Sequence, residues 1–195
     1  MLLGKYLKSI PAEVKLFLLK AVLLFVFWKV IYLCFLTPGP THISPFTYNV
    51  GELTAKGLNL FTQSHSYRSK TEMGIDQDFN YKPIHVLQQS VYFLNNKLVG
   101  IYDGCNALDL FVLYAGFIIC MPAPIKQRIF FIVGGTALIF IVNILRCMGI
   151  TYMIQYYPRQ ANFAHHFVFV FIVYALIIAL WLIFANNIKL KNNGK

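Results

Sequence analysis

The sequence predicts an all-α integral membrane protein, a bundle of about four transmembrane helices with both termini in the cytoplasm. Hydrophobic residues make up 58% of the 195-residue chain and charged residues 12%, about half the charged share of a soluble globular domain. The mean hydropathy is +0.61, and the apolar residues gather into runs near the ~20 residues that cross a bilayer as a helix. A soluble all-helical protein, the alternative, could not bury this much apolar surface.

Four apolar runs are the predicted spans, and they cover approximately residues 16–36, 107–121, 129–147 and 167–184. Backbone groups inside the hydrocarbon need partners within the chain, so each run is predicted to be a helix. The second run is short and is predicted to begin near Cys105. Together the runs predict a single membrane domain over residues 1–195.

The distribution of basic residues predicts how the spans are oriented. The formal net charge is +10, and nine of the seventeen Lys and Arg residues flank the apolar runs, in the N-terminal segment, the 122–128 loop and the C-terminal tail. Short basic segments stay in the cytoplasm, so these three are predicted to lie inside and residues 37–104 and 156–164 outside. The basic residues thus serve topology, and no nucleic-acid partner is expected.

The first run is predicted to be an uncleaved anchor. It is longer than the apolar region of a signal peptide, and Thr37-Pro38-Gly39-Pro40 follows it in place of a small-x-small cleavage site.

The predicted extracytoplasmic insertion, residues 37–104, contains two expected elements. Spaced apolar residues over Val50–Phe61 are typical of an interfacial amphipathic helix. The segments Ser90–Leu94 and Lys97–Tyr102 predict a β-hairpin that turns at Asn95-Asn96, because Asn tolerates the positive φ of a tight turn. The insertion is interpreted as a lid or spacer in preference to a separately folded domain.

Three of the predicted spans carry chemically active side chains at their outer ends. Cys105 lies where the second span leaves the outer surface, Arg146 at the outer end of the third, and His165 and His166 at the start of the fourth. Ionisable residues in spans are costly and are candidates for function. Because the three segments alternate in direction, a random distribution would scatter these residues between the two faces.

The set is chemically coherent as a nucleophilic site. A Cys105 thiolate is a nucleophile, a histidine exchanges protons, and Arg146 can hold a carboxylate or a developing oxyanion. Asp109, one helical turn after Cys105, could orient the histidine or pair with Arg146 or Lys29, and Asn143 lies one turn before Arg146. Each residue also has a plain structural interpretation, such as an arginine that reaches the lipid headgroups.

Redox and metal chemistry are weaker interpretations of the same residues. Cys34, Cys105 and Cys147 all map near the outer side, so a disulfide between two of them stays open. The chain has no CxxC pair, which argues against zinc. Adjacent histidines on a helix point about 100° apart, which disfavours His165 and His166 as joint ligands of haem or copper. No cofactor and no metal are expected.

Three motifs resemble the exosortase/archaeosortase family, in particular its short Bacteroidetes-type exosortases. They are Gly104-Cys105-Asn106-Ala107-Leu108, Asn143-Ile144-Leu145-Arg146 and His165-His166-Phe167. Their order and spacing agree with the family, and the resemblance covers an exosortase-like catalytic core over residues 100–185. Two positions depart from the family pattern: Cys-Asn-Ala replaces the commoner Cys-Ser-Gly, and Phe169 stands where a glycine is expected.

The resemblance implies a multi-pass cysteine protease or transpeptidase in the cytoplasmic (inner) membrane, with its active site facing outward. Its protein substrates would end in a short motif, a transmembrane helix and a basic tail, and lipids would surround its spans. Cys105 would be the nucleophile, Arg146 the stabiliser and His165 the acid/base, with His166 the alternative and Asn106, Asp109 and Asn143 in support. A non-catalytic membrane subunit for the assembly or export of surface polysaccharide or protein is the alternative function.

Overall fold

The computed structural model describes residues 12–32, 43–77 and 83–193. These residues divide into two compact units. Of the described residues, the first comprises 12–32, 111–136 and 180–193, and the second 43–77, 83–110 and 137–179. In chain order the elements are α2 (Ala12–Ile31), α3 (Pro45–Thr62), β1 (Tyr67–Gln77), β2 (Pro83–Phe93), β3 (Asn96–Ile101), η2 (Asp103–Cys105), α4 (Leu108–Cys120), α5 (Ile125–Tyr156), α6 (Pro158–Phe163), η3 (Ala164–Val168) and α7 (Phe169–Asn193).

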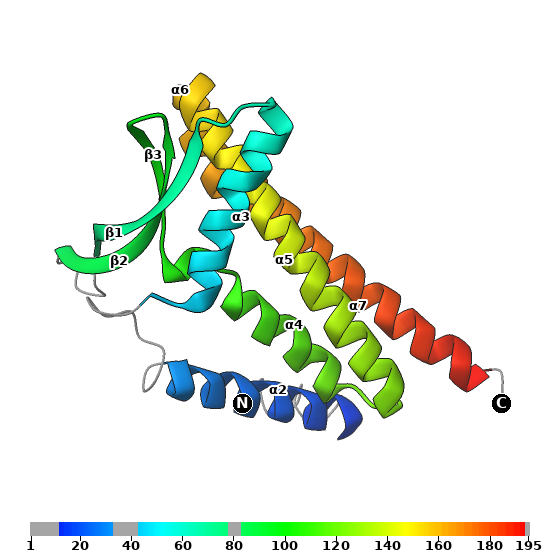
Figure 1. Ribbon diagram of the computed structural model, residues 1–195. Coiled ribbons are helices and arrows are strands. Elements are labelled where there is room, and N and C mark those ends of the chain that lie inside the picture. The colour runs from blue at the N-terminus through cyan, green and yellow to red at the C-terminus, as the bar shows by residue number, and fades with distance from the viewer. Residues whose placement is uncertain (1–11, 33–42, 78–82, 194–195) are drawn as a thin grey trace. The chain divides into compact units, whose positions relative to one another are not determined.

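The second unit is built on a small sheet covered by a helix. The three strands are antiparallel in the order β1-β2-β3, and α3 lies against them (Figure 1). Helix α3 begins where Ser44 Oγ accepts a hydrogen bond from the Phe46 amide (3.3 Å) and proline occupies the first turn, a favourable helix start. Its buried face joins Tyr67, Val91 and Cys147 in one apolar core.

A polar layer separates α3 from part of the sheet. The side chain of Gln89, which is 1% exposed, accepts from the Thr71 hydroxyl (2.6 Å) and donates to that of Ser69 (2.6 Å). A Cβ at Gly51 of α3 would lie 2.1 Å from Gln89 Cγ. The absence of a side chain at this glycine therefore lets the helix approach the sheet.

These features bear on three expectations about the insertion. The fold is not all-α, because β1 adds a third strand to the expected hairpin. The helix over Val50–Phe61 is present but starts at Pro45, and one face of it is buried against the sheet. Leu53, Leu60 and Phe61 of the same helix are exposed, and its position at a bilayer surface stays a prediction. Helix α3 and the strands contribute buried residues to one core, and the role of the insertion as a lid or spacer stays a prediction.

The expected hairpin is confirmed, with its turn one residue earlier. Phe93 pairs with Asn96, so Leu94 and Asn95 form the turn, and Leu94 adopts φ 54°. The Phe93 ring packs on Tyr67, with ring centroids 4.9 Å apart. This contact joins paired residues of β1 and β2, whose register matters because a slip of one residue would turn every side chain to the other face.

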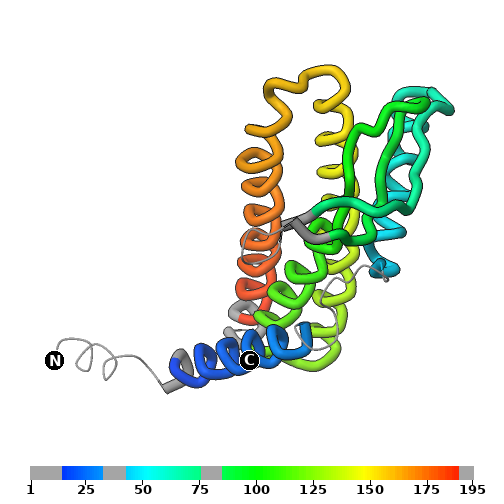
Figure 2. The backbone as a smooth tube through the Cα atoms, turned by 90° about the vertical axis from the view of Figure 1, so that its left-hand side faces the viewer, coloured from blue at the N-terminus to red at the C-terminus, as the bar shows by residue number. Residues whose placement is uncertain are grey.

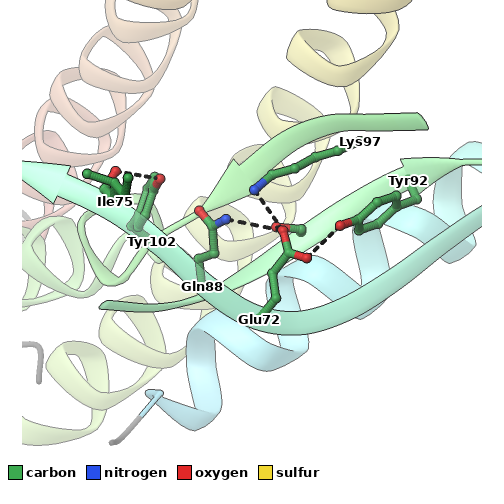
Figure 3. Close-up of polar contacts among 7 residues, drawn as sticks. Glu72, Ile75, Gln88, Tyr92, Lys97 and Tyr102 are labelled. Carbon is green, nitrogen blue, oxygen red and sulfur yellow. Dashed lines mark hydrogen bonds and ion pairs between the residues drawn. The ribbon is translucent and has the colours of Figure 1, made fainter. Parts of the chain in front are cut away.

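The opposite face of the sheet carries a cluster around Glu72 (Figure 3). Its carboxylate accepts from Lys97 Nζ (2.7 Å), Ser90 Oγ (2.7 Å) and Tyr92 OH (2.5 Å). The hydrogen bonds from Lys97, Tyr92 and Ser90 lower the pKa of Glu72 to about 2, and the same carboxylate raises the pKa of Tyr92. The cluster joins all three strands by way of Lys97 on β3.

Among the described residues, two helices are long and apolar enough to cross a membrane, Ile125–Tyr156 and Pro158–Ile188. They contain the third and fourth predicted spans, and the chain reverses direction between them (Figure 2). The expected 156–164 loop is almost entirely helical, since Tyr157 alone separates α5 from α6. Likewise α5 begins at Ile125, inside the expected 122–128 loop.

The described parts of the other two predicted spans are helical, but neither helix meets the length and composition of a membrane-spanning helix. Helix α4 has 13 residues, and α2 carries Lys15, Lys20 and Lys29 within its 20 residues. The number of spans and their orientation therefore stay predictions. Cys34 and the Thr37–Pro40 helix breaker lie outside the described residues.

Aromatic packing holds the first unit together. Phe117 stacks on Trp181 with ring centroids 4.3 Å apart and meets Phe17 edge-on at 5.4 Å. The Tyr114 hydroxyl donates to the Phe131 carbonyl at 2.8 Å. A Cβ at Gly135 would lie 2.1 Å from that hydroxyl oxygen, so a glycine is needed where α5 passes Tyr114.

The Glu72 cluster predicts an acid-sensitive contribution to stability. Because the folded-state pKa lies below the usual 4.5, the contribution is complete above pH of about 4.5 and is lost as the pH falls toward 2. We expect Glu72→Gln to lower the free energy of unfolding by about 1 kcal/mol at pH 7 and to flatten the decline below pH 4.5. Thermal unfolding of the detergent-solubilised protein against pH measures both effects.

The matched control is Glu52→Gln. Glu52 pairs with Lys56, whose side chain is 73% exposed, so its removal should change stability by less than about 0.5 kcal/mol. Equal pH profiles for wild-type and Glu72→Gln proteins would contradict the account.

Candidate functional site

The turn that carries Cys105 is held against the start of α3. Within η2 the Cys105 amide donates to the Tyr102 carbonyl at 2.8 Å. The Asp103 carboxylate accepts from the Ser44 amide at 3.3 Å and from the Thr47 hydroxyl, which also places a negative charge near a helix N-terminus. Sequence reasoning missed this role of Ser44 and Thr47, although Ser-Pro at residues 44–45 is a recognisable helix start.

The next residue, Asn106, links that turn to α4. Its side chain is 3% exposed, accepts from the Leu108 amide (2.9 Å) and donates to Thr47 Oγ1 (3.2 Å). Ala107, between Asn106 and the start of α4, adopts φ 64°, a left-handed conformation that is strained for a residue with a Cβ. Asn106 therefore fixes the conformation of the chain on the C-terminal side of Cys105, and its supporting role in catalysis stays a prediction.

Asn143 ties the same turn to α5. Its side chain is fully buried, and Nδ2 donates to the Cys105 carbonyl at 2.9 Å. Arg146 follows three residues later on the same helix face. Position 143 thus fixes where the Cys105 turn meets the helix that carries the arginine.

Arg146 reaches His165 across the bend between α5 and α6. Its Nη2 lies 3.4 Å from His165 Nε2. Because guanidinium can only donate, Nε2 accepts in this contact, which leaves the proton of a neutral ring on Nδ1. His165 belongs to η3, a π-helical turn, and such turns are frequent at functional sites.

Cys105, Arg146 and His165 line one cavity of about 390 Å³. One wall is Val99–Tyr102 of β3 and its continuation, and another is formed by Cys147, Ile150 and Ile154 of α5. Pro158, Ala161 and Asn162 of α6 complete the lining. Three separate segments of the second unit therefore bring the thiol, the guanidinium and the imidazole to a mostly apolar space.

The remaining candidates lie outside this lining. His166 is exposed and its ring packs edge-on against His165, with centroids 4.8 Å apart. Asp109 is exposed at the start of α4 and does not line the cavity. Lys29 has its ammonium group over the rings of Phe25 and Tyr32, 5.8 and 5.3 Å from their centroids.

No group of metal-ligating side chains is found among the described residues. Cys105, Cys120 and Cys147 are free thiols, so the disulfide considered between Cys105 and Cys147 is not formed. Any pairing with Cys34 falls outside the described residues.

Ala107 offers a test of the local strain. We expect Ala107→Gly to raise the free energy of unfolding by about 0.5–1 kcal/mol, because glycine adopts φ near 64° without a steric penalty. Ala107→Val should lower it, since a β-branched side chain is least tolerant of this conformation. Thermal unfolding measures both variants, and a destabilised Ala107→Gly protein would contradict the assignment.

Comparison with known families agrees with the motifs. The family model described as transmembrane exosortase (Exosortase_EpsH) matches residues 10–183, a range that contains every residue lining the cavity. No curated protein and no solved structure matches the chain. The match and the two apolar helices identify a membrane protein. The resemblance seen in the sequence is confirmed: the chain belongs to the transmembrane exosortase family.

Proposed function

We propose that the protein is a cysteine protease or transpeptidase that cleaves C-terminal sorting signals of exported proteins at the outer face of the cytoplasmic membrane. Family membership supports the processing of sorting signals at a general level. The specific reaction rests on one observation, the shared cavity of Cys105, Arg146 and His165.

Arg146 is suited to stabilise charge that develops during the reaction. Its Nε is buried and has no hydrogen-bond partner among the described residues. Buried polar atoms are rarely left unpaired without a reason. An oxyanion site requires a donor that has no partner in the resting protein and lines the same cavity as the nucleophile. Such a donor becomes satisfied when the scissile carbonyl gains negative charge.

His165 is the better of the two histidines for proton transfer. It lines the cavity, whereas His166 does not. The 3.4 Å contact with Arg146 is longer than a strong N–H···O or N–H···N hydrogen bond. When a substrate draws Arg146 toward its carbonyl, Nε2 can therefore lose its contact with the guanidinium and accept a hydrogen bond from the thiol of Cys105.

The reaction follows from these roles. The thiol proton passes to His165 while Cys105 Sγ bonds to the scissile carbonyl carbon, and Arg146 donates to the resulting oxyanion. The C–N bond then breaks, the amine leaves with the proton from His165, and a thioester remains. Water or an amine attacks the thioester, which releases an acid or a new amide and restores the thiol.

The substrate is a membrane-anchored protein with a C-terminal motif, a transmembrane helix and a basic tail. The two long apolar helices carry many exposed hydrophobic side chains, among them Val133, Leu145 and Phe171. Such a surface fits lipid or another transmembrane helix. A substrate anchored in the same bilayer would meet the enzyme by lateral diffusion.

Processing of sorting-signal proteins in the producing cell tests the proposal. Cys105→Ala should abolish processing, and Arg146→Gln or His165→Gln should reduce it by at least about 100-fold, the usual contribution of such groups. Accumulation of substrate that retains its C-terminal tail, measured by mass spectrometry of the membrane fraction, reports the loss.

His166→Gln is the matched control for His165→Gln, and it should process substrate normally. Full processing by the Cys105→Ala protein would overturn the proposal. Normal surface assembly by Cys105→Ser, with substrates intact, would support a non-catalytic assembly subunit instead.

A further inference from the structure

Strand β3 is an edge of the sheet. Among the described strands it pairs with β2 alone, so every second residue directs its N–H and C=O away from the sheet. Natural proteins usually protect such edges with charges or proline. The stretch Val99–Ile101 contains neither, and the nearby charge of Lys97 is engaged by Glu72 on the face of the sheet (Figure 3).

This edge, which carries no charge or proline over Val99–Ile101, lies along the cavity. Val99–Tyr102 are among the cavity-lining residues, and Ile150, Ile154 and Ala161 line it from the helices. Val99 and Gly100 are half-buried and Ile101 is 2% exposed. Backbone polar groups in such a setting need partners, and an extended peptide supplies N–H and C=O groups at the matching spacing.

The strand also leads directly to the nucleophile. Ile101 ends β3, and Cys105 follows four residues later in η2. The Cys105 amide donates back to the Tyr102 carbonyl at 2.8 Å, so the turn folds close to the end of the strand. A peptide aligned on β3 is thereby carried toward Cys105, which lines the same cavity as Arg146.

We propose that the substrate segment around the scissile bond binds as an added β-strand on the outer edge of β3, over Val99–Ile101, with uncharged side chains against Ile150 and Ile154. This inference rests on the proposed function, since it assigns a substrate-binding mode to the same site. Affinity comes mainly from main-chain hydrogen bonds, and the apolar wall excludes charged side chains.

A reactive peptide tests this mode without knowledge of the natural substrate. The probe is acetyl-Val-Ala-Val-Ala chloromethyl ketone, which alkylates Cys105 Sγ with loss of chloride, and its rate is compared with that of chloroacetamide on the purified full-length protein. Single N-methylation of each amide in turn removes one donor. We expect the rate to fall roughly tenfold at alternate positions and little at the others, because alternate amides face β3.

A protein-side variant provides a second measurement. Ile154→Trp fills the cavity opposite β3 and should lower the ratio of the peptide rate to the chloroacetamide rate by roughly tenfold. Ile141→Trp is the control, because Ile141 lies on the same helix, is 53% exposed and does not line the cavity. It should leave both rates unchanged.

The outcomes separate the two proposals. If Cys105 reacts with chloroacetamide but its rates with the N-methylated peptides show no alternation, strand addition is wrong, while the assignment of Cys105 as the nucleophile is retained. A Cys105 that reacts with neither reagent contradicts the proposed function, and the binding mode with it.

Discussion

The hydrogen bond from Asn143 to the Cys105 carbonyl, 2.9 Å long, fixes the geometry on which the site depends. Cys105 lies in a three-residue turn, which has little stability of its own, so its position is set by what it contacts. Asn143 holds it from α5, and the Asp103 and Asn106 side chains hold it through Thr47 of α3. Because the contact from Asn143 is to the main chain, it positions the turn whatever side chain occupies residue 105.

Helix α3 and the sheet, which precede this turn in the chain, are attached to α5. Helix α3 and the sheet share one apolar core with Cys147 of α5, and Tyr67 donates to Gln155 near the end of that helix (2.5 Å). Cys147 and Gln155 of α5, about two helical turns apart, thus both contact the part formed by α3 and the sheet. A rigid attachment of this kind lets an edge strand serve as one wall of a reactive cavity.

The sequence predicted the parts of the fold that depend on local pattern. Apolar runs located the helices, and alternation located the hairpin. The sequence did not predict strand β1, Tyr67–Gln77, because this segment lacks the apolar alternation of a half-buried strand. Its partners on β2, Gln88–Ser90, are polar and buried, so polar contacts take the place of apolar ones along this strand. The predicted topology placed Cys105, Arg146 and His165 at one depth, and the structure brings them to one cavity. The hydrogen bonds that hold the turn join residues 38 to 59 apart in sequence, and no local pattern encodes such pairs.

The central claim is that Cys105 forms a covalent bond to substrate within this cavity. Protein isolated from producing cells, quenched in acid and digested, should contain a Cys105 peptide with an added acyl mass that neutral hydroxylamine removes. Peptides with the free thiols Cys120 and Cys147 should carry no such adduct. Processing that continues at a normal rate with no hydroxylamine-sensitive adduct on Cys105, under conditions that trap thioesters, would contradict the account.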